Sequence, residues 1–455
     1  MNQFKSENPA TQRINATYPA DTPGDVDSKL ERSVQAFNKW KRVPVEDRCR
    51  LMREVAVQLR CNGRRWAELM TQEMGKLLRE AEGEIEKCAL GCEFYADNGA
   101  EFLLSRDYPS NASESYVQSS PLGTVLGVMP WNFPFWQVIR FAVPTIVAGN
   151  SVVLKHASNV PGCALALQEL FEKSGFPQGV FQTLLIGSKE VATVISDVRV
   201  AAVSLTGSEA AGKAVAREAG SHIKKCVLEL GGIDPFIVLE DADLKAAAAT
   251  ALTARYQNCG QSCIAAKRLI VVEGVYEAFV ERFLRAVKGL VMGDPMEETT
   301  SLGPLAKGEF RDEILGQIKT SVNQGGELLL GGRARAGVGY FLEPTVLVGV
   351  SPEMSCASEE VFGPVAPILC VRDACQAIEV ANATDYGLGA SLWTADLVRA
   401  KELANELESG QVFINSMVTS DPRLPFGGVK KSGYGRELAE CGVREFVNLK
   451  TVSFR

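Results

Sequence analysis

The sequence predicts an α/β protein with two lobes, each built around its own doubly wound, Rossmann-like sheet. The chain has 455 residues, which is long for a single hydrophobic core. Short apolar segments alternate with helical segments, a pattern typical of parallel sheets. This alternation starts near Gly123 and starts again after Ala247. We therefore expect two sheets with a large cleft between the lobes.

Amphipathic helices are expected to come first in the chain. Apolar residues recur every three or four positions over residues 26–40, and the same periodicity marks residues 47–59 and 66–86. Around Tyr116 the chain becomes rich in Ser and Asn and then in β-prone residues. Residues 103–121 are therefore predicted to be an extended excursion whose strand pairs outside its own lobe.

Two series of short apolar segments predict the strands of the two sheets. The first series comprises residues 123–129, 151–154, 180–185, 201–205 and 226–230. The second series comprises residues 269–272, 345–350, 366–371 and 411–414. No period of 20 to 50 residues repeats, which excludes a solenoid.

Composition excludes several classes of function. The net charge of −7 and interspersed lysines and arginines argue against a nucleic-acid binder, and no apolar stretch is long enough to cross a membrane. The 12 cysteines form no disulfide framework, and only two histidines are available for a zinc site or a Ser-His-Asp triad. No metal site is expected. The first 25 residues carry no targeting pattern, so a cytoplasmic location is the default expectation.

Three segments carry residues suited to chemistry. Cys263 ends a loop with a glycine bend, where a thiolate can be presented, although a free cysteine is more often a small buried hydrophobe. Asn132 follows a strand and lies among rigid residues. Its side chain could donate to an oxyanion, or it could belong to a capped turn. Glu229 ends a strand shortly before two glycines. It could act as a general base, or it could be a solvated strand terminus.

Taken together, these segments resemble the aldehyde dehydrogenase superfamily. The similarity continues in order through residues 206–208 (Thr-Gly-Ser), 359–364 (Glu-Glu-Val-Phe-Gly-Pro) and 425–428 (Pro-Phe-Gly-Gly). It spans nearly the whole chain, and six motifs at compatible spacing make it specific. The aldehyde dehydrogenase fold is therefore expected.

The resemblance also implies a domain organisation. Residues 1–102 and 122–230 would form the cofactor-binding domain, and residues 231–432 the catalytic domain. Residues 103–121 and 433–455 would form a small β arm for oligomerisation, with a strand over residues 445–455. The implied assembly is a homodimer or a dimer-based homotetramer.

The mechanism implied by the resemblance is physically reasonable. Cys263 attacks an aldehyde to give a thiohemiacetal, whose oxyanion is held by the Asn132 amide and the Cys263 N–H. Hydride transfer to a nicotinamide leaves a thioester, which water activated by Glu229 hydrolyses.

The cofactor site lacks the usual GxGxxG fingerprint. Gly207 and Ser208 instead open a near P-loop in which Ala214 replaces the Mg²⁺-binding hydroxyl, which argues against an NTPase and still suits a pyrophosphate. The resemblance assigns Ser208 to that phosphate and Glu360 to the nicotinamide ribose. It places Phe362 and Trp131 beside the cofactor.

The cofactor preference is expected to depend on Lys155 and Ser158. Relatives that prefer NAD often have Glu at the Ser158 position, where it binds the ribose 2′-hydroxyl. A serine beside Lys155 accommodates a 2′-phosphate, so NADP is predicted to be preferred. The alternative is that Ser158 tolerates both cofactors. His156 replaces a proline common in the family.

The substrate is predicted from Arg140, Ser420 and Trp136. Arg140 matches the arginine that anchors the substrate carboxylate in succinic semialdehyde dehydrogenases, and Ser420 resembles the substrate-binding serine of that subfamily. Trp136 would supply a tunnel wall. Succinic semialdehyde is the expected substrate. One alternative is that Arg140 forms a surface or interlobe salt bridge. Another is that the substrate is glutaric semialdehyde or an uncharged short aldehyde.

Two further possibilities concern the cysteines. Cys259 lies four residues before Cys263, so a reversible disulfide could silence the nucleophile under oxidation, or Cys259 is simply a small packed residue. The chain could also be a non-catalytic structural homologue or a thiol-reactive binding protein. The intact set of Cys263, Asn132 and Glu229 argues against that class.

Overall fold

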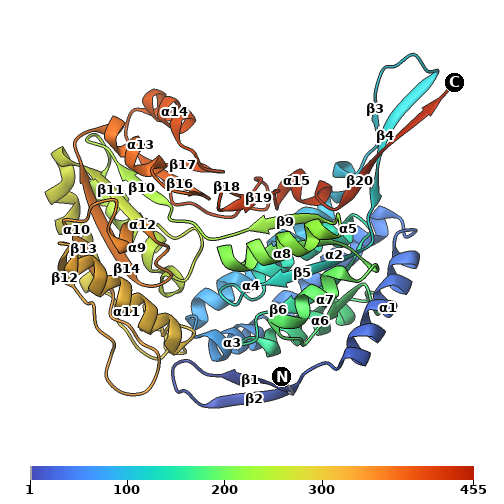
Figure 1. Cartoon of the computed structure of the whole chain (residues 1–455), viewed down its shortest axis with the longest axis horizontal. Coiled ribbons are helices and arrows are strands. Elements are labelled where there is room, and N and C mark those ends of the chain that lie inside the picture. The colour runs from blue at the N-terminus through green and yellow to red at the C-terminus, as the bar shows by residue number, and fades with distance from the viewer. Residues whose placement is uncertain (1–2) are drawn as a thin grey trace.

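Both predicted lobes are present in the computed structural model, which describes residues 3–455 (Figure 1). The first lobe contains a six-stranded sheet that is parallel except at its β19 edge. Its strands, in spatial order, are β19 (Gly433–Tyr434), β9 (Lys225–Glu229), β8 (Val200–Thr206), β5 (Thr124–Met129), β6 (Ser151–His156) and β7 (Phe181–Thr183). The prediction of a doubly wound first lobe is confirmed.

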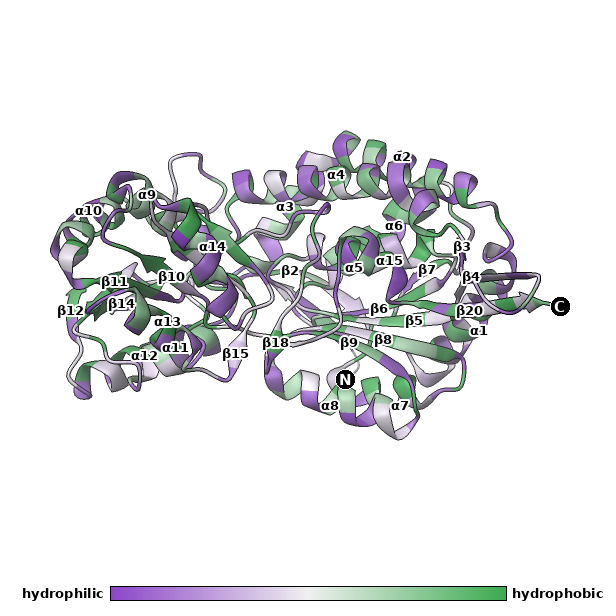
Figure 2. Ribbon diagram, turned by 90° about the horizontal axis from the view of Figure 1, so that it is seen from above, coloured by the Kyte–Doolittle hydropathy of each residue, from purple (hydrophilic) through white to green (hydrophobic). Residues whose placement is uncertain are grey.

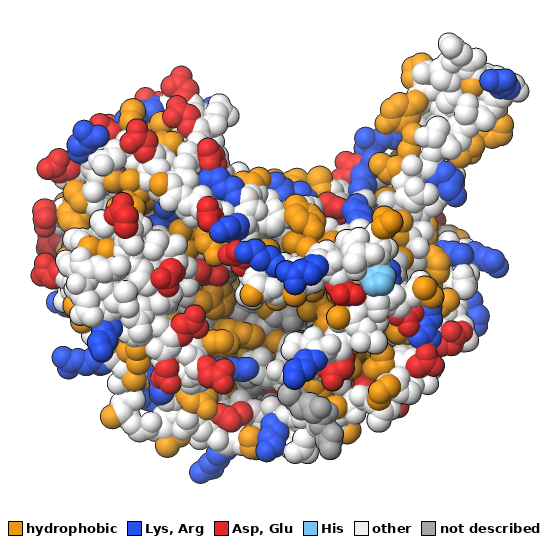
Figure 3. Space-filling view, viewed as in Figure 1, with side chains coloured by type: hydrophobic (Ala, Val, Ile, Leu, Met, Phe, Trp, Pro, Cys, Tyr) orange, Lys and Arg blue, Asp and Glu red, His pale blue; other side chains and the backbone are white. Residues whose placement is uncertain are grey.

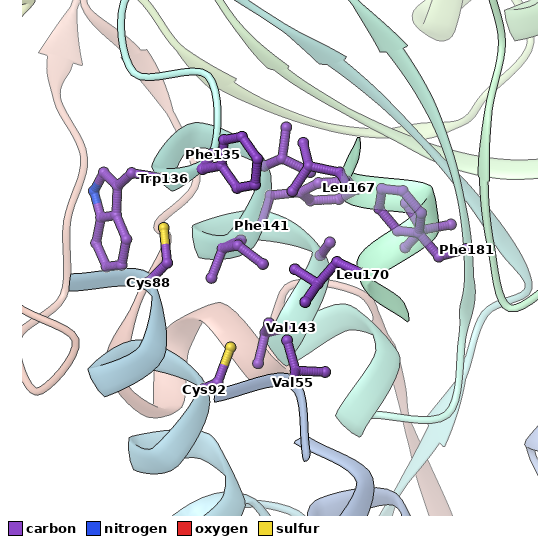
Figure 4. Close-up of a cluster of buried hydrophobic side chains, with 14 of the residues drawn as sticks. Val55, Cys88, Cys92, Phe135, Trp136, Phe141, Val143, Leu167, Leu170 and Phe181 are labelled. Carbon is purple, nitrogen blue, oxygen red and sulfur yellow. The ribbon is translucent and has the colours of Figure 1, made fainter. Parts of the chain in front are cut away.

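Helices cover both faces of this sheet because its strands are apolar on both sides (Figure 2). On β5, Val125 faces the core under α2 to α6, whereas the next residue, Leu126, faces the core under α7 and α8. Figure 4 shows the first of these cores, where Phe135, Phe141 and Leu167 pack together. The helices of this lobe are α1 (Pro23–Trp40), α2 (Val45–Cys61), α3 (Gly63–Met74), α4 (Leu78–Phe102), α5 (Trp136–Val147), α6 (Pro161–Lys173), α7 (Val191–Ser196), α8 (Glu209–Ser221) and α15 (Ala439–Arg444).

The second lobe is built around a seven-stranded sheet, parallel except at its β12 edge. Its strands, in spatial order, are β12 (Glu327–Leu330), β13 (Thr345–Val348), β14 (Val365–Val371), β11 (Arg268–Val272), β10 (Pro235–Val238), β16 (Ala390–Trp393) and β17 (Val412–Ile414). Its helices are α9 (Leu244–Tyr256), α10 (Tyr276–Lys288), α11 (Gly308–Asn323), α12 (Ser355–Ser358), α13 (Ala374–Asn382) and α14 (Leu397–Glu406).

A three-stranded antiparallel sheet projects from the first lobe beside the C-terminus (Figure 1). It consists of β20 (Val447–Phe454), β4 (Glu114–Pro121) and β3 (Arg106–Asp107). The predicted extended excursion thus pairs with the end of the chain and not with the lobe sheet. Residues 433–434, in contrast, pair with β9 in the six-stranded sheet.

The helix predicted over residues 66–86 is wrong in its continuity. The structure ends α3 at Met74 and begins α4 at Leu78, because Gly75 adopts a left-handed conformation with φ 80°. A Cβ on Gly75 would lie 2.7 Å from Pro304, so the turn also permits close packing against the second lobe. The gap between α3 and α4 is short, so the spacing of apolar residues continues across it with little change. Periodicity alone therefore did not reveal the break.

Several strands were not predicted. The chain begins with an antiparallel hairpin of β1 (Gln3–Glu7) and β2 (Ile14–Pro19), whose polar faces gave little signal. Four-residue strands β10, β12 and β16 in the second lobe were also missed, and a small pair joins β15 (Tyr386–Gly387) to β18 (Val429–Lys430). Within residues 3–455, no helix is both long enough and apolar enough to cross a membrane.

Candidate active site

Two cavities, each lined by residues of both lobes, meet at Cys263. Figure 3 shows that the surface is hollowed between the lobes. The larger has a volume of about 380 Å³ and the smaller about 90 Å³. Residues from both lobes line the larger one, including Trp131, Asn132, Gly207, Ser208, Glu229, Glu360 and Phe362. Of the residues predicted for the catalytic and cofactor sites, the structure therefore brings all but Lys155, Ser158 and Cys259 to one cavity.

The loop that presents Cys263 has an unusual backbone. Asn258, Cys259 and Gly260 all have positive φ, at 53°, 55° and 70°. A Cβ on Gly260 would lie 2.3 Å from the Gly363 carbonyl oxygen, so this position requires glycine. Consecutive left-handed residues persist only where the surroundings hold them, and such strain is concentrated at functional sites.

Hydrogen bonds within the loop and to the first lobe hold this loop in place. The Asn258 amide nitrogen Nδ2 donates to the backbone carbonyls of Asn132, at 2.8 Å, and Gln261, at 3.1 Å. The Asn258 backbone N–H donates to both carboxylate oxygens of Glu80, at 3.2 and 3.1 Å. The loop is thus fixed to the segments after β5 and at the start of α4.

The Cys263 thiol is a weak acid in this environment. Burial raises its pKa to about 11, although the positive charges of Arg140 and Lys267 oppose that shift. The Lys267 ammonium also donates to the Cys263 carbonyl oxygen at 2.6 Å. Without a bound ligand, the sulfur is therefore protonated at neutral pH.

Asn132 lies just past the end of β5 and is 3% exposed. Its Nδ2 donates to the Gln261 carbonyl oxygen at 3.1 Å. A carboxamide carries two N–H groups, so one donor of Asn132 remains for an oxyanion formed beside Cys263.

Glu229 is the last residue of β9 and is buried in the larger cavity. Its Oε1 atom has no hydrogen-bond partner among the described residues. Burial and the nearby carboxylate of Glu437 raise the pKa of Glu229 well above its usual value. Both effects favour the neutral form of the Glu229 side chain.

Aromatic and polar groups shape the rest of the larger cavity. The Trp131 ring stacks on Phe310 at a centroid distance of 5.1 Å and meets Phe362 edge-on at 5.8 Å. Glu360 forms an ion pair with Lys267 at 3.2 Å. Ser208 caps α8 by accepting from the Ala211 N–H at 3.3 Å, so the first turn of that helix opens at the cavity.

Lys155 and Ser158 lie away from the larger cavity. Ser158 lines a separate, open cavity of about 640 Å³ together with Lys307 and residues of the N-terminal hairpin. Burial and the charge of Lys307 lower the pKa of Lys155. The His156 ring bonds to the Pro134 carbonyl at 2.9 Å, so the replacement of proline ties β6 to the segment that carries Asn132.

Arg140, Trp136 and Ser420 line the smaller cavity with Cys263. The Trp136 Nε1 donates to the Ser420 hydroxyl at 2.9 Å. The Arg140 guanidinium forms an ion pair with Glu437, donates to Thr206 Oγ1 at 3.3 Å and lies 4.6 Å from the centre of the Phe426 ring.

Cys259 faces a different environment from Cys263. Its thiol is buried in the core of the second lobe and donates to the Gly303 carbonyl oxygen at 3.3 Å. Cys263 packs against the core of the first lobe. Both residues are free thiols in this structure.

Sequence reasoning missed three charged residues of this site, namely Lys267, Glu437 and Lys87. Lys267 is 1% exposed and directly precedes the buried strand β11. A basic residue before an apolar run was therefore the one sequence feature that could have pointed to it. Lys87 lies far from any predicted motif, and Glu437 lies nine residues after the motif that ends at Gly428; neither residue carried such a signal.

A thiol, an amide and a carboxylate converge on one cavity between the two lobes. This arrangement is that of an enzyme that uses a cysteine for covalent catalysis. A family model described as "Aldehyde dehydrogenase family" matches residues 1–452. The chain belongs to the aldehyde dehydrogenase family.

Individual relatives are similar over nearly their whole length. The chain is 46% identical to succinate semialdehyde dehydrogenase Sad, specified as NAD(P)+, of Escherichia coli K12, covering 98% of this chain and 97% of the relative. It is 47% identical to succinate-semialdehyde dehydrogenase 1, specified as NADP(+), of Mycobacterium tuberculosis H37Rv, covering 98% of each. The crystal structure of succinic semialdehyde dehydrogenase from Streptococcus pyogenes with NADP+ superposes with a TM-score of 0.97 at 39% identity, covering 99% of each chain.

Proposed function

We propose that this protein oxidises succinic semialdehyde to succinate with NADP as the hydride acceptor. The observation that carries the proposal is the position of Cys263 at the junction of two cavities, with Asn132 and Glu229 beside it. The relatives named above, with 46% and 47% identity, support both the substrate and the cofactor.

In this proposal the chemistry takes place on the Cys263 sulfur. The thiol passes its proton to solvent as substrate and cofactor bind, and the thiolate attacks the aldehyde carbon. The free N–H of the Asn132 amide and the Cys263 backbone N–H hold the resulting oxyanion. NADP, when bound, would supply the hydride acceptor, and loss of hydride from that carbon would leave a thioester on Cys263. Glu229, once its own proton has passed to solvent, removes a proton from the water that attacks the thioester, and the C–S bond breaks to release succinate and regenerate Cys263.

The residues that line the larger cavity fit a dinucleotide. The opening turn of α8, capped by Ser208, suits a pyrophosphate, and Glu360 suits the hydroxyls of the nicotinamide ribose. Trp131 and Phe362 supply apolar walls. Lys155 and Ser158, with no carboxylate side chain between them, favour the 2′-phosphate of NADP over NAD, which we propose binds less well.

The smaller cavity fits a short aldehyde that carries a carboxylate. Arg140 contributes positive charge to its wall, and Ser420 and Trp136 contribute a polar contact and an apolar surface. Glutaric semialdehyde is the second candidate substrate, because the same charge would attract it.

We further propose that the sheet of β20, β4 and β3 is an oligomerisation arm of a homodimer or a dimer-based homotetramer. Its support is the projection of this sheet from the body of the molecule (Figure 3) and two exposed apolar side chains on β20, Leu449 at 54% and Phe454 at 48%.

A steady-state panel tests the proposed activity. Formation of NADPH or NADH is followed with succinic semialdehyde, glutaric semialdehyde and uncharged butanal, and Cys263→Ala is the blank. We expect the highest kcat/KM for succinic semialdehyde with NADP. Absence of aldehyde-dependent reduction of either cofactor would contradict the proposal and favour a non-catalytic role.

A further inference from the structure

A second cation reaches the smaller cavity from α4. Lys87 lies on this helix and lines the cavity together with Arg140, Ser420 and Cys263. No motif marks it, because its nearest site neighbours in the chain are about 50 residues away.

The Lys87 side chain is held in one orientation. Its Nζ donates to the Ser420 hydroxyl at 2.7 Å and lies 4.5 Å from the centre of the Trp136 ring. The same Ser420 oxygen accepts from Trp136 Nε1 at 2.9 Å. Because this oxygen accepts two hydrogen bonds, its own proton is left to be donated to a further acceptor.

α4 has space for the Trp136 ring beside Lys87. One turn after Lys87, Gly91 leaves space for the indole, since a Cβ there would lie 3.1 Å from Trp136. Figure 4 shows Cys88 of α4 beside the Trp136 ring. Lys87 and Trp136 therefore form a rigid corner of the cavity with Ser420 between them.

The two cations of the cavity differ in how their charge is compensated. Arg140 is paired with the buried carboxylate of Glu437. Lys87 forms no ion pair with any carboxylate in residues 3–455, and the nearby Glu84 is already committed to Lys76 and to the backbone of α5. The uncompensated positive charge of this cavity thus lies on Lys87.

We propose that Lys87 binds the carboxylate of the substrate directly, together with the Ser420 hydroxyl, and thereby selects an anionic aldehyde. In this arrangement Arg140, whose charge is compensated by Glu437, forms part of the wall. The inference rests on the proposed function and names the residue that makes the substrate class selective. The volume of about 90 Å³ leaves room for only a short chain between this corner and Cys263.

The main test replaces Lys87 by methionine, which keeps the length of the side chain and removes its charge. We measure kcat and KM for succinic semialdehyde and for butanal in wild type, Lys87→Met and Lys87→Arg. Lys319→Met, on the exposed face of α11, is the matched control. In Lys87→Met, the ratio of kcat/KM for succinic semialdehyde to that for butanal should fall about 10- to 100-fold, mostly through KM. Lys87→Arg should restore part of the ratio.

The possible outcomes are distinct. An unchanged ratio in Lys87→Met, or an equal loss on both aldehydes, would overturn the role of Lys87, the latter by showing that the residue only supports the structure. A wild-type enzyme that does not oxidise succinic semialdehyde would instead contradict the proposed function. The wild type is therefore measured before the variants.

A measurement on the wild type keeps the proposal testable if the variant fails to fold. Burial, together with the charge of Arg140, lowers the pKa of Lys87 to about 8. The ammonium is the binding form, so KM for succinic semialdehyde should rise above about pH 8 relative to KM for butanal. A flat ratio of the two KM values between pH 7 and pH 9.5 would overturn the proposal. The charged and titratable groups around Lys87 are Arg140, Cys88, Glu84, Lys76 and Asp421.

Discussion

The two cavities that meet at Cys263 are built in different ways. One wall of the larger is formed by segments at the ends of strands of the six-stranded sheet, with Asn132 after β5, Ser208 after β8 and Glu229 at the end of β9. Carboxyl ends of parallel strands gather at one edge, so each contribution is a short motif at a predictable place. The smaller cavity has no such edge.

Side chains from distant elements form the smaller cavity instead. Lys87 comes from α4, Trp136 from α5 and Ser420 from a loop of the second lobe. Lys87 and Ser420 are 333 positions apart in the chain and yet form a hydrogen bond. The comparison indicates that local motifs supply much of the lining of the larger cavity, whereas tertiary packing brings the residues of the smaller cavity together.

Replacing Cys263 by serine should have the largest effect, because both cavities depend on this one atom. A hydroxyl is a much weaker nucleophile, so kcat should fall about 10⁴-fold or more, as measured by NADPH formation. Binding of cofactor, followed by fluorescence titration, should remain. A variant with substantial activity would show that the two cavities do not share Cys263 as nucleophile.

Replacing Glu229 by glutamine tests the catalytic role assigned to the larger cavity. The amide cannot accept the proton of the attacking water, so kcat should fall about 10²- to 10⁴-fold. Rapid mixing should still give a burst of about one NADPH for each active site, because thioester formation precedes the blocked step. Loss of the burst would place Glu229 in the first half of the reaction.

A matched pair of substitutions tests whether the two ligands bind independently. Ser158→Glu places a carboxylate near the expected 2′-phosphate and should raise KM for NADP about 10- to 100-fold, with little change for the aldehyde. Ser420→Ala removes one hydrogen bond in the smaller cavity and should raise KM for succinic semialdehyde about tenfold, with little change for NADP. Steady-state kinetics with each ligand varied would show whether Ser158→Glu also changes KM for the aldehyde or Ser420→Ala also changes KM for NADP.

The acidity of Cys263 gives a smaller, graded effect. Only the thiolate reacts with iodoacetamide, and the pKa of Cys263 is raised to about 11. In the absence of cofactor, the rate of inactivation should therefore rise about tenfold for each pH unit from 7 to 10. A plateau below pH 9 would mean that the thiol ionises more easily than its burial indicates.

Cys259 provides the smallest predicted effect. If a Cys259–Cys263 disulfide forms under oxidation, diamide should inactivate the wild type reversibly and Cys259→Ala should resist it. Activity measured before and after thiol reduction checks this. Equal inactivation of Cys259→Ala would exclude the disulfide, in keeping with the hydrogen bond from Cys259 to Gly303 in the core of the second lobe.

Much of the fold was predictable, because strands buried on both faces give continuous apolar runs. The runs around β5, β6, β8 and β9 were found in this way. Short strands such as β10 and polar ones such as β1 and β2 gave weak patterns and were missed. The break at Gly75 escaped because helical periodicity continues across it.

The sequence by itself determined the class of chemistry, since Cys263, Asn132 and Glu229 stand in motifs that together resemble one family. Only the tertiary structure decided the charges around them. It paired Arg140 with Glu437, joined Lys267 to Glu360 and left Lys87 without a carboxylate partner among the described residues. The physical reason is that electrostatic interactions act through space between side chains that packing brings together, and sequence spacing does not encode those distances.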